Sequence, residues 1–441
     1  MNTILFYVSN MLILYALSLL VITWLTRPID IAYVFKNLIK QKRRSSITLS
    51  AIVLGGVAIF IFGGFINYSY WSVREQTIRS NLGHIQIFAK GALTSGVDTN
   101  LQYTLDNYQE IKKILMQDEQ LKPLIETVTG QLNFSGIISF YDNSQSTFFN
   151  GLGIEADKSL ILGSFDTVVS GSDLSKVRPF EITVGSGLAS KLGVKYGDYV
   201  EMLVVNPEGG QNAASHQLRG IFKSGLKEYD DTWLKMPLET AQSLMQTENV
   251  SKVIIVLKDT ENTDLAYKRI QTLLKGHKIE ADIRNWEQLA INYQQVVNFF
   301  EGIFLFIKVI VSIIVIFMIG NTLMMNVVER TKEIATLRAL GLPKKRVRRL
   351  FVLEGVFIGI FGAGISLSLG IFLSWLINLN GLPMKPAPGY TEGYLAFILW
   401  KDNPSLIWFT CALPLVTALL ASIIPSNKAA SLLIAKAFRF N

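Results

Sequence analysis

The sequence predicts an α-helical membrane protein that carries one folded α+β domain outside the membrane. Half of the 441 residues are apolar, and the mean hydropathy of +0.34 is high for a soluble protein and low for one made only of membrane spans. Five apolar runs are long enough for a bilayer, which needs about 20 helical residues. Between the second and the third run lies a segment of mixed polarity of about 230 residues, which is large enough to fold as a domain.

The apolar runs predict five membrane spans. They are Ile4–Leu25, Ile47–Tyr68, Phe299–Met325, Phe351–Ile377 and Leu406–Ile424. The first run resembles a signal peptide in length, but no basic residue precedes it, and the stretch Thr23-Trp24-Leu25-Thr26 is a poor cleavage site. We interpret it as an uncleaved transmembrane helix within residues 1–26, with a helix lying in the membrane interface as the alternative.

The distribution of charge predicts the orientation of the spans. Residues 27–44, 329–350 and the tail from Ser426 together carry 17 basic and 3 acidic residues, whereas the net charge of the whole chain is only +8. Short basic segments next to spans stay in the cytoplasm. The large domain, the loop 378–405 and the N-terminus are therefore expected outside. Because the positive charge follows the span ends, nucleic acid is excluded as a partner.

These boundaries divide the chain into eight parts. We expect an extra N-terminal transmembrane helix (1–26), a cytoplasmic amphipathic helix (27–45), a transmembrane helix with the start of a stalk (46–69), an extracytoplasmic domain (70–297), a transmembrane helix (298–328), a cytoplasmic coupling segment (329–350), two transmembrane helices with a short outer loop (351–425) and a cytoplasmic tail (426–441). The amphipathic helix follows from Ile31, Phe35, Leu38 and Ile39 on one side and lysines on the other.

The extracytoplasmic domain alternates strand and helix patterns. "HIQIF", "LDNYQEIKKIL" and "IETVTGQL" predict one β-α-β unit at about 84–131, and "KVIIVLK", "NTDLAYKRIQTLLKG" and "KIEADIR" predict a second at about 251–284. Two such halves suit a split βαβ fold. The β-rich insertion between them, 133–248, contains the turn sequence "NPEGGQNAASH", which predicts an exposed hairpin tip. The insertion is interpreted either as a partner-binding subdomain or as a solvated loop region.

Two helices are expected to connect this domain to the membrane. Residues Tyr70–Leu82 continue the second span, and Asn285 can cap a following helix with Gln288 in the capping-box position. No Pro interrupts Trp286–Val328, so one continuous helix of about 64 Å is predicted there. Rigid helices of this kind can transmit motion across a membrane.

Small residues in the fourth span predict close helix packing. Gly355, Gly359 and Ala363 lie on one face, and a second face carries Gly362, Ser366, Gly370 and Ser374. Small residues at this spacing let helices approach closely.

Charged residues within the spans are few. Glu301 and Lys308 point the same way on the third span. Lys308 either extends its side chain toward Glu301 at the outer interface or, together with Glu301, faces a cargo head group. The small number of such charges argues against a channel or an ion-coupled carrier.

The sequence offers little for catalysis or for a metal. The single cysteine, Cys411, excludes an internal disulfide, and the three histidines His84, His216 and His277 show no ligand spacing. The nearest match to a phosphate-binding loop, "GIFKSGL", has Leu226 where that motif needs a lysine. We expect a non-enzymatic chain that binds no cofactor of its own.

The charged stretch Asn326–Phe351 between two spans predicts a docking element. Glu329 and Glu333 lie one turn apart, Ile334, Leu337 and Leu340 form an apolar stripe, and Gly341 and Pro343 end the helix. Apolar side chains flanked by charges suit insertion into the groove of a partner. The alternative is an ordinary basic loop whose apolar residues face lipid.

The same stretch resembles a known family. "LMMNVVERTKEIATLRALGLPKKRVRRLFVLEGVFIGIFGAGIS" and the tail "ALLASIIPSNKAASLLIAKAFRF" closely resemble the FtsX-like permease domain of ABC transporters of the MacB and LolC/LolE type. "FKNLIKQKRRSSITLSAIVLGGVAIFI" resembles the first helix and span of that family, and "NLGHIQIFAKG" resembles its outer domain. The likeness covers about residues 30–441. The family has four spans, so the first span here is extra.

The resemblance implies a mechanism and a set of coupling residues. It implies an outer domain with Porter and Sabre parts and a homo- or heterodimer of permeases. Two separate ATPase subunits would bind ATP and Mg²⁺ and drive the outer domains by mechanotransmission. The residues that would contact an ATPase subunit are Glu329, Arg330, Glu333, Ile334, Leu337, Arg338 and Gly341.

The resemblance also suggests a cargo and a compartment. We expect a bacterial inner-membrane permease that releases lipoprotein or lipid-like cargo toward the outer membrane, assisted by a periplasmic lipid-binding chaperone. One alternative is a MacB-like export pump that works with a periplasmic adaptor and an outer-membrane tunnel. A second alternative is a division-type protein that signals to cell-wall hydrolases.

Overall fold

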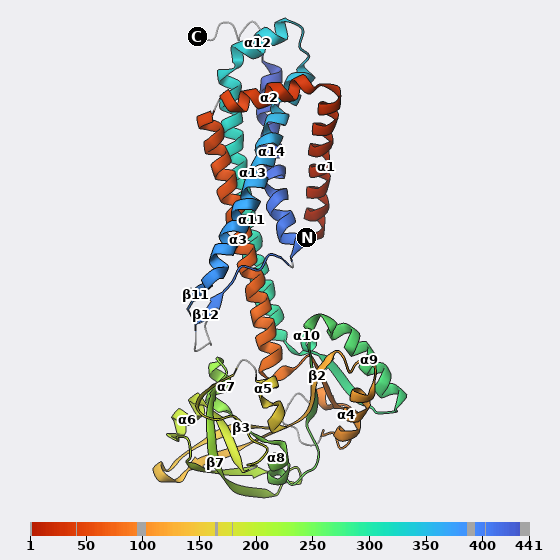
Figure 1. Ribbon diagram of the computed structural model, residues 1–441, viewed down its shortest axis with the longest axis vertical. Helices are drawn as coiled ribbons and strands as arrows, with labels where there is room; N and C mark the ends of the chain where they lie inside the picture. The colour runs from red at the N-terminus through yellow and green to blue at the C-terminus, as the bar shows by residue number, and fades with distance from the viewer. Residues whose placement is uncertain are drawn as a thin grey trace. The chain divides into compact units, whose positions relative to one another are not determined.

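The computed structural model describes residues 2–40, 42–94, 103–163, 166–178, 180–385, 393–401 and 403–432. The chain divides into two compact units (Figure 1). The first, called here the helical unit, consists of Met1–Tyr70, Val297–Pro383 and Leu395–Asn441. The second, called the outer unit, consists of Trp71–Val296 and Met384–Tyr394.

The helical unit is built from long apolar helices. Its helices are α1 (Asn2–Thr26), α2 (Pro28–Lys40), α3 (Lys42–Thr77), α11 (Ile291–Glu329), α12 (Thr331–Ala339), α13 (Lys344–Asn380) and α14 (Pro404–Ser431). Four of them, α3, α11, α13 and α14, are each long and apolar enough to cross a membrane, and a fifth span is counted if α1 and α2 are taken as one broken pair. This confirms the four family spans of the predicted fold class, whereas the extra N-terminal span stays a prediction.

The N-terminal helix α1 packs inside the helical unit. Ile13 and Ala16 lie in one buried cluster with Ala412 and Leu415 of α14. After Thr26 the chain bends by 114° into α2, where Pro28 occupies the first helical position that its fixed φ angle favours. At 25 residues, α1 is about 37 Å long, which is enough for a bilayer.

The two small-residue faces of α13 contact two different helices. A Cβ atom on Gly359 would lie 3.0 Å from the Cβ of Ala418 in α14. On the other face, a Cβ on Gly362 would lie 2.5 Å from Ile52 of α3, and one on Gly370 would lie 2.8 Å from the ring of Phe60. The remaining small residues follow the same division, with Gly355 against Ser422, Ser366 against Gly56, and Ala363 and Ser374 buried. The glycines therefore permit close approach on both sides.

The outer unit contains the predicted split βαβ fold. The first half is β1 (Ile85–Ala89), α4 (Tyr108–Gln117) and β2 (Ile125–Phe140), and the second half is β9 (Lys252–Leu257), α9 (Thr263–Gly276) and β10 (Ala281–Asn285). The strand order is β10-β1-β9-β2, and each neighbouring pair is antiparallel. The two strands of each half therefore run parallel to each other, and a strand of the other half lies between them.

The insertion forms a closed barrel. Its strands are β3 (Gln145–Ile154), β4 (Thr167–Gly171), β5 (Glu181–Gly185), β6 (Tyr199–Val205), β7 (Gln211–Lys223) and β8 (Trp233–Pro237). Pairing runs β2-β3-β8-β5-β7-β6 and returns from β6 to β2, while β4 pairs with β7 outside this ring. The insertion does not begin at residue 133 as predicted, because the 16-residue strand β2 starts at Ile125 and belongs to both parts. The expected hairpin tip is the short turn 206–210 between β6 and β7.

Short elements complete the chain. In the outer unit they are α5 (Ser159–Leu162), α6 (Ser186–Leu192), α7 (Lys227–Thr232), α8 (Leu238–Met245), α10 (Trp286–Leu289) and the 3₁₀ turns Ala92–Thr94, Tyr141–Asn143, Ala156–Lys158 and Thr260–Asn262. Two strands of three residues, β11 (Leu382–Met384) and β12 (Tyr394–Ala396), pair in the predicted loop between α13 and α14.

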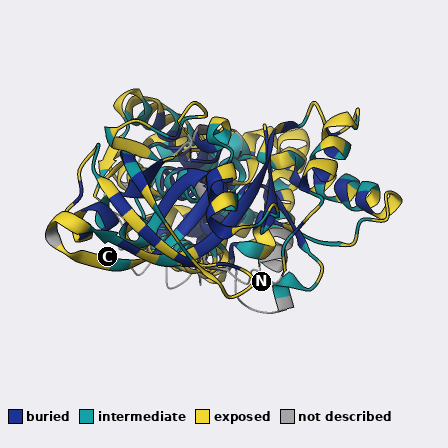
Figure 2. Cartoon of the chain, turned by 90° about the horizontal axis from the view of Figure 1, so that it is seen from below, coloured by how far each residue is buried: buried dark blue, intermediate teal, exposed yellow. Residues whose placement is uncertain are grey.

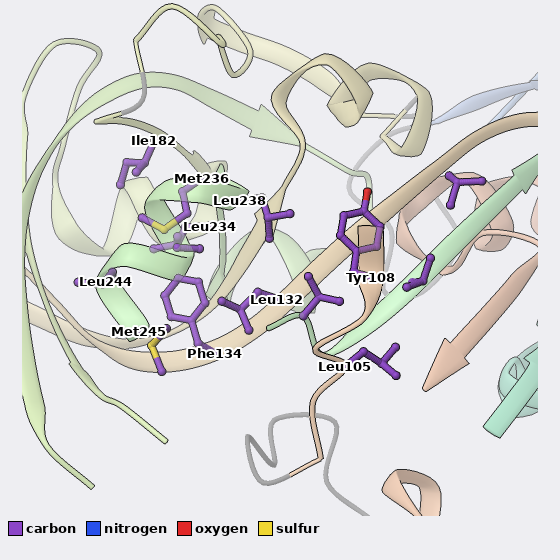
Figure 3. Packing of buried hydrophobic residues seen from close by; sticks show 14 of the residues in the cluster. Leu105, Tyr108, Leu132, Phe134, Ile182, Leu234, Met236, Leu238, Leu244 and Met245 are labelled. Carbon is purple, nitrogen blue, oxygen red and sulfur yellow. The ribbon is translucent and has the colours of Figure 1, made fainter. Parts of the chain in front are cut away.

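One hydrophobic core runs through the split βαβ sheet and the barrel. Figure 3 shows Leu132 and Phe134 of β2 packed near Met236 of β8 and near Leu244 and Met245 of α8. Seen from below in Figure 2, the strands are largely buried, and the outer faces of the neighbouring helices are exposed. Because β2 contributes to both parts, the two share one core.

The helices that enter the outer unit are interrupted. After Thr77, α3 changes into a π-helix at Ile78–Leu82, which ends at Gly83. The predicted continuous helix from Trp286 to Val328 is wrong, because α10 ends at Leu289 and Ala290 (φ −88°, ψ 59°) separates it from α11. The predicted cap is present, since the Asn285 side chain accepts a hydrogen bond from the Gln288 N–H at 3.0 Å. Trp286 and Ala290 pack on Ile78, which accounts for the break.

Candidate functional site

The candidate docking segment is a helical hairpin formed by α12 and the turn that follows it. The helix α11 ends at Glu329, and Arg330 (φ −96°, ψ 14°) joins it to α12. At the other end, Gly341 has φ +96°, and hydrogen bonds run from the Leu342 N–H to the Leu337 carbonyl and from the Gly341 N–H to the Arg338 carbonyl. This is a Schellman motif, which needs a residue such as glycine in the left-handed region.

Arg330 is the centre of a polar network at the base of this hairpin. Its Nε donates to Glu333 Oε2 at 3.0 Å, and its Nη2 donates to the Tyr33 hydroxyl of α2 at 2.6 Å. The Tyr33 hydroxyl in turn donates to Glu333 Oε1 at 2.6 Å. Arg330 Nη1 also lies 3.7 Å from Glu354 Oε2 of α13. One guanidinium therefore links α2, α12 and α13.

The surroundings of Arg330 stabilise its charge. Its guanidinium carbon lies 5.4 Å from the ring centre of Tyr33 and 5.7 Å from that of Phe351, a geometry that favours cation–π attraction. Burial opposes the charge of Arg330, but the hydrogen bond to Glu333 and the attraction of Tyr33, Glu333 and Glu354 together outweigh it and raise the pKa of Arg330. Partial burial likewise opposes the charge of Glu333, yet hydrogen bonds from Arg330 and Tyr33 hold the pKa of Glu333 below its usual value.

Glu354 is a buried carboxylate that depends on this network. It is 4% exposed and accepts a hydrogen bond from Asn326 Nδ2 at 2.8 Å. A carboxylate removed from water needs such partners, since an isolated buried charge is strongly unfavourable. Because Glu354 closely follows the basic cluster 344–349, the sequence predicts that it pairs at the inner interface, and its partners in the structure are Asn326 and Arg330.

The apolar stripe of α12 divides into a buried and an exposed part. Ile334 is 3% exposed and packs with Val327, Val347 and Phe351 of the same chain, so the expectation that it enters the groove of a partner needs correction. Leu337 is half-buried, whereas Leu340 is 80% exposed. The helix turns Ile334 inward because α12 lies against α13.

The exposed face of the hairpin follows from the helical period. Lys332, Glu333, Thr336 and Leu340 are exposed and recur at spacings of three or four residues, which place them on one side of a helix. Glu329, the last residue of α11, is also exposed and precedes them. We call these five residues the docking face. Of the residues predicted to contact an ATPase, Glu329 and Glu333 lie on it.

The remaining predicted coupling residues hold the hairpin in place. Arg338 donates from Nη1 to the carbonyl of Leu432 and, at 3.4 Å, to that of Ala430 near the end of α14. A second clamp joins α2 to α13, where Arg346 Nη2 and Nε donate to Asp30 Oδ1 at 2.6 and 3.1 Å. These contacts bring the three basic segments to one end of the helical unit, where Figure 1 shows α2 and α12.

Glu301 and Lys308 on α11 do not form an ion pair in the part of the chain that the structure describes. Glu301 is exposed. The Lys308 ammonium lies 3.9 Å from the ring centre of Phe304 and 4.5 Å from that of Phe409 on α14. Aromatic rings stabilise a cation where water is scarce, so packing against these rings takes the place of the expected extension toward Glu301.

The outer face of the barrel carries an apolar row across four strands. Phe148 of β3 pairs with Ile137 of β2, Ile137 pairs with Leu203 of β6, and Leu203 pairs with Ala213 of β7. Phe148 is 78%, Ile137 37% and Leu203 41% exposed. A cavity of about 520 Å³ lies against these strands, and none of the described residues that line it is charged.

The three histidines and the acidic residues form no metal site among the residues that the structure describes, because no group of three His, Cys, Asp or Glu side chains meets there. His216 lies in the barrel and contacts the Phe180 carbonyl at 3.2 Å, and His277 contacts the Leu273 carbonyl at 3.0 Å. His84 belongs to a different arrangement, described below.

Comparison with known proteins agrees with this architecture. Residues 305–434 match the family described as FtsX-like permease C-terminal. Residues 45–273, more than half of the chain, match the MacB-like periplasmic core domain. The chain is an ABC transporter permease of the FtsX-like, MacB-like family. The resemblance seen in its sequence is thereby confirmed, and the FtsX-like match includes the whole hairpin formed by α12 and the turn that follows it.

Two relatives of this FtsX-like permease align with most of its length at modest identity, and a third aligns with about half. The lipoprotein-releasing system transmembrane protein LolC of Neisseria meningitidis is 23% identical over 433 residues, covering 93% of this chain and 99% of that protein. LolE of Haemophilus influenzae is 23% identical, covering 86% and 90%. The macrolide export ATP-binding/permease protein MacB of Brucella abortus is 27% identical over 47% of this chain and 30% of that protein.

Two residues of this FtsX-like permease that the sequence did not single out are central to its hairpin. Tyr33 lies 297 positions before Arg330 in the chain, and its hydroxyl connects Arg330 to Glu333. The available signal for Tyr33 was its position on the same side of the amphipathic helix as the lysines. The sequence alone does not indicate its partner. Asn326, a polar residue at the end of an apolar span, was the corresponding signal for the Glu354 contact.

Proposed function

We propose that this chain is the membrane subunit of a mechanotransmission ABC transporter. Separate ATPase subunits, which bind ATP and Mg²⁺, contact the docking face, and the movement that follows is carried by α3 and α11 toward the outer unit. The observation that supports this most is the Arg330 network. It fixes the docking hairpin to α2 and α13 at the same time, so a force on α12 acts on several helices rather than bending a loose loop.

The assembly follows from the same proposal. Two copies of the ATPase act with two permeases, either two copies of this chain or this chain and a related one. The basic segments at one end of the helical unit face the cytoplasm. The chain then lies in the inner membrane of a bacterial cell, with the outer unit and the N-terminus on the periplasmic side. A reporter that is active only in the cytoplasm, fused to the N-terminus, is expected to be silent, and activity there would contradict the topology.

We propose lipoprotein or lipid-like cargo. Two relatives that align with most of this chain are named lipoprotein-releasing proteins. The uncharged apolar row on the barrel supports this, since a surface that lacks charge favours hydrocarbon or apolar side chains over ionic ligands. Glu301 and Lys308 stay candidates for contact with a head group of the cargo.

The alternative is a MacB-like export pump, which the partial likeness to a macrolide exporter favours. The two proposals differ in their periplasmic partner. Purification of the intact complex is expected to yield a soluble lipid-binding chaperone and lipidated protein. Recovery of a membrane-anchored periplasmic adaptor in place of the chaperone would favour the pump.

The docking role is tested by substitution on the hairpin. We expect Glu329→Lys with Leu337→Asp to abolish stimulation of the partner ATPase while the protein still inserts in the membrane. Because Leu337 is half-buried, the pair Glu329→Lys and Leu340→Asp tests the same face with less risk to the fold. Lys345→Glu, an exposed charge change outside α12, is the control. Normal stimulation in both double variants would contradict the docking role.

A further inference from the structure

The last turn of α3 is tied to the sheet of the outer unit by a chain of hydrogen bonds. The Leu257 N–H of β9 donates to His84 Nδ1 at 3.0 Å. His84 Nε2 lies 3.0 Å from the Thr260 hydroxyl, which donates to Glu75 Oε1 at 2.8 Å. Glu75 stands on α3, within the outer unit. We call His84, Thr260 and Glu75 the relay.

The relay requires one neutral form of His84. Because Nδ1 accepts from a backbone N–H, the proton of the ring must be on Nε2, which then donates to Thr260. His84 is completely buried, and burial lowers the pKa of His84 to about 4. The charged groups near it are Glu75, Arg79 and Arg74. A second proton would set Nδ1–H against the Leu257 N–H and break the relay.

The backbone of His84 makes two further connections. Its N–H donates to the Ile255 carbonyl of β9, and its carbonyl accepts from the Trp286 N–H of α10, both at 2.9 Å. The preceding residue, Gly83, has φ +66°, and a Cβ atom there would lie 2.3 Å from Ile254. His84 is thus held against both β9 and the start of the second connecting helix.

The relay spans a point where the helix itself is weakened. The residues between Glu75 and His84 include the π-helix Ile78–Leu82, a geometry that is rare and is found often at functional sites. Glu75 also accepts from Arg79 Nε at 3.2 Å, and Arg79 Nη1 reaches Glu126 of β2 at 3.2 Å. Without cross-links past the π-helix, movement of α3 would be absorbed by bending there.

We propose that His84 is a positioning residue, which with Thr260 fixes the end of α3 to the C-terminal end of β9, so that movement of the helix rotates the outer unit. This inference rests on the proposed mechanotransmission. The relay joins the helix end to the sheet directly, and the packing of Ile78 on Trp286 joins the two connecting helices to each other. Together they make the helix ends and the sheet one rigid body.

The test uses the full-length permease with its ATPase partner in nanodiscs. Cys411 is replaced by Ser, and spin labels are placed at two exposed positions, Asn380 and Lys275. The distance between the labels is measured with and without ATP. Thr260→Val removes only the hydroxyl that joins His84 to Glu75, and Thr260→Ser keeps it. His277→Gln, a change at an exposed histidine, is the matched control.

We expect Thr260→Val to reduce the ATP-dependent distance change at least twofold, with ATPase activity within twofold of the parent. Thr260→Ser and His277→Gln should behave like the parent. Glu75→Gln removes the negative charge at the helix end of the relay, and its ATP-dependent distance change should fall as in Thr260→Val. With two such variants, a folding defect in one of them does not decide the result. An unchanged distance response in Thr260→Val, even with lowered thermal stability, would overturn the inference. No ATP response in the parent would instead refute the proposed function.

Discussion

The docking hairpin and the relay are both places where a long helix is interrupted and held by buried polar groups, but they are built from different chemistry. At the hairpin, α11 stops at Arg330 and the contacts are ionic, with Glu333 47% exposed at its side chain. At the relay, α3 ends in a π-helix and the central group, His84, is neutral and completely buried.

This difference suits the two ends to different tasks. A partly exposed ionic network can exchange partners, because solvent and incoming charges compete for its groups. The hydrogen bonds of a completely buried neutral ring such as His84 have no such competitor, and a missing hydrogen bond there leaves an unsatisfied polar group. In the proposed mechanism the hairpin would receive the contacts of the ATPase, and the relay would hold a fixed geometry.

The largest expected effect comes from removing Arg330. Arg330→Met leaves Glu354 buried without its cationic neighbour, and breaking such a pair costs about 3–5 kcal/mol. We expect a lower melting temperature and loss of ATPase stimulation. Adding Glu354→Gln should restore most of the stability without restoring stimulation, and Lys345→Ala, an exposed position outside the docking face, serves as the control. Equal recovery of both properties would show that the network acts only on stability.

A change of pH separates the two ends. The folded pKa of His84, about 4, lies below its unfolded value of about 6.5. As the pH falls through 6.5 the unfolded state takes up a proton that the folded state refuses, so the outer unit loses stability between pH 6.5 and 4, by about 3 kcal/mol. The exchange rate of the Leu257 amide, divided by its intrinsic exchange rate at each pH, should rise as the pH falls through this window. In His84→Gln the exchange rate, corrected for intrinsic exchange, should depend less on pH. The same pH dependence in parent and variant would contradict a role for this histidine.

Two apolar residues of the docking hairpin, Leu340 and Ile334, should respond in opposite ways. Leu340→Asp, at an 80% exposed site, is expected to change stability by less than about 0.5 kcal/mol but to weaken ATPase stimulation severalfold. Ile334→Ala, at a 3% exposed site, should cost about 2 kcal/mol or more. Thermal melting and ATPase assays check both. If Leu340→Asp left stimulation intact, the docking face would have to be placed elsewhere.

Salt should have the smallest effect and act at one end only. Raising the salt concentration from 0.05 to 0.5 M screens partly exposed ion pairs, so amide exchange of α12 should speed up by an amount that corresponds to less than about 1 kcal/mol. The Leu257 amide, which is bonded to a neutral ring, should exchange at an unchanged rate. Equal salt sensitivity of the α12 amides and the Leu257 amide would contradict the proposed difference between the hairpin and the relay.

The elements of the fold could be predicted because their signals are local. Apolar length identified the spans, and alternating patterns identified both β-α-β units. Closure of the barrel could not be predicted, since it depends on pairing between β2 and β6, whose partners Ile137 and Leu203 are far apart in sequence. The break at Ala290 was missed for a similar reason. Alanine favours helix, and the cause of the break is tertiary packing of Trp286 on Ile78.

The candidate sites show the same limit. The sequence located the hairpin and its charged residues, because Gly341, Pro343 and the helical spacing are local features. It could not assign Ile334 to the inside, since which side of a short amphipathic helix is covered depends on its neighbours. It treated His84 as an isolated histidine, because Thr260 and Glu75 meet it only after folding and follow no recognisable spacing.

The strand Ile125–Phe140 limits how the outer unit can be exchanged between related proteins. It closes the barrel and also forms one edge of the split βαβ sheet. A chimaera joined at residue 133 would divide this strand in its middle. Its two halves would then come from different proteins and would have to keep one pairing register with the neighbouring strands. A graft that takes only the residues after Phe140 keeps the β2 strand of the host as one strand of the barrel. Recombination at this site therefore selects donors whose β3 and β6 already pair with the β2 of the host.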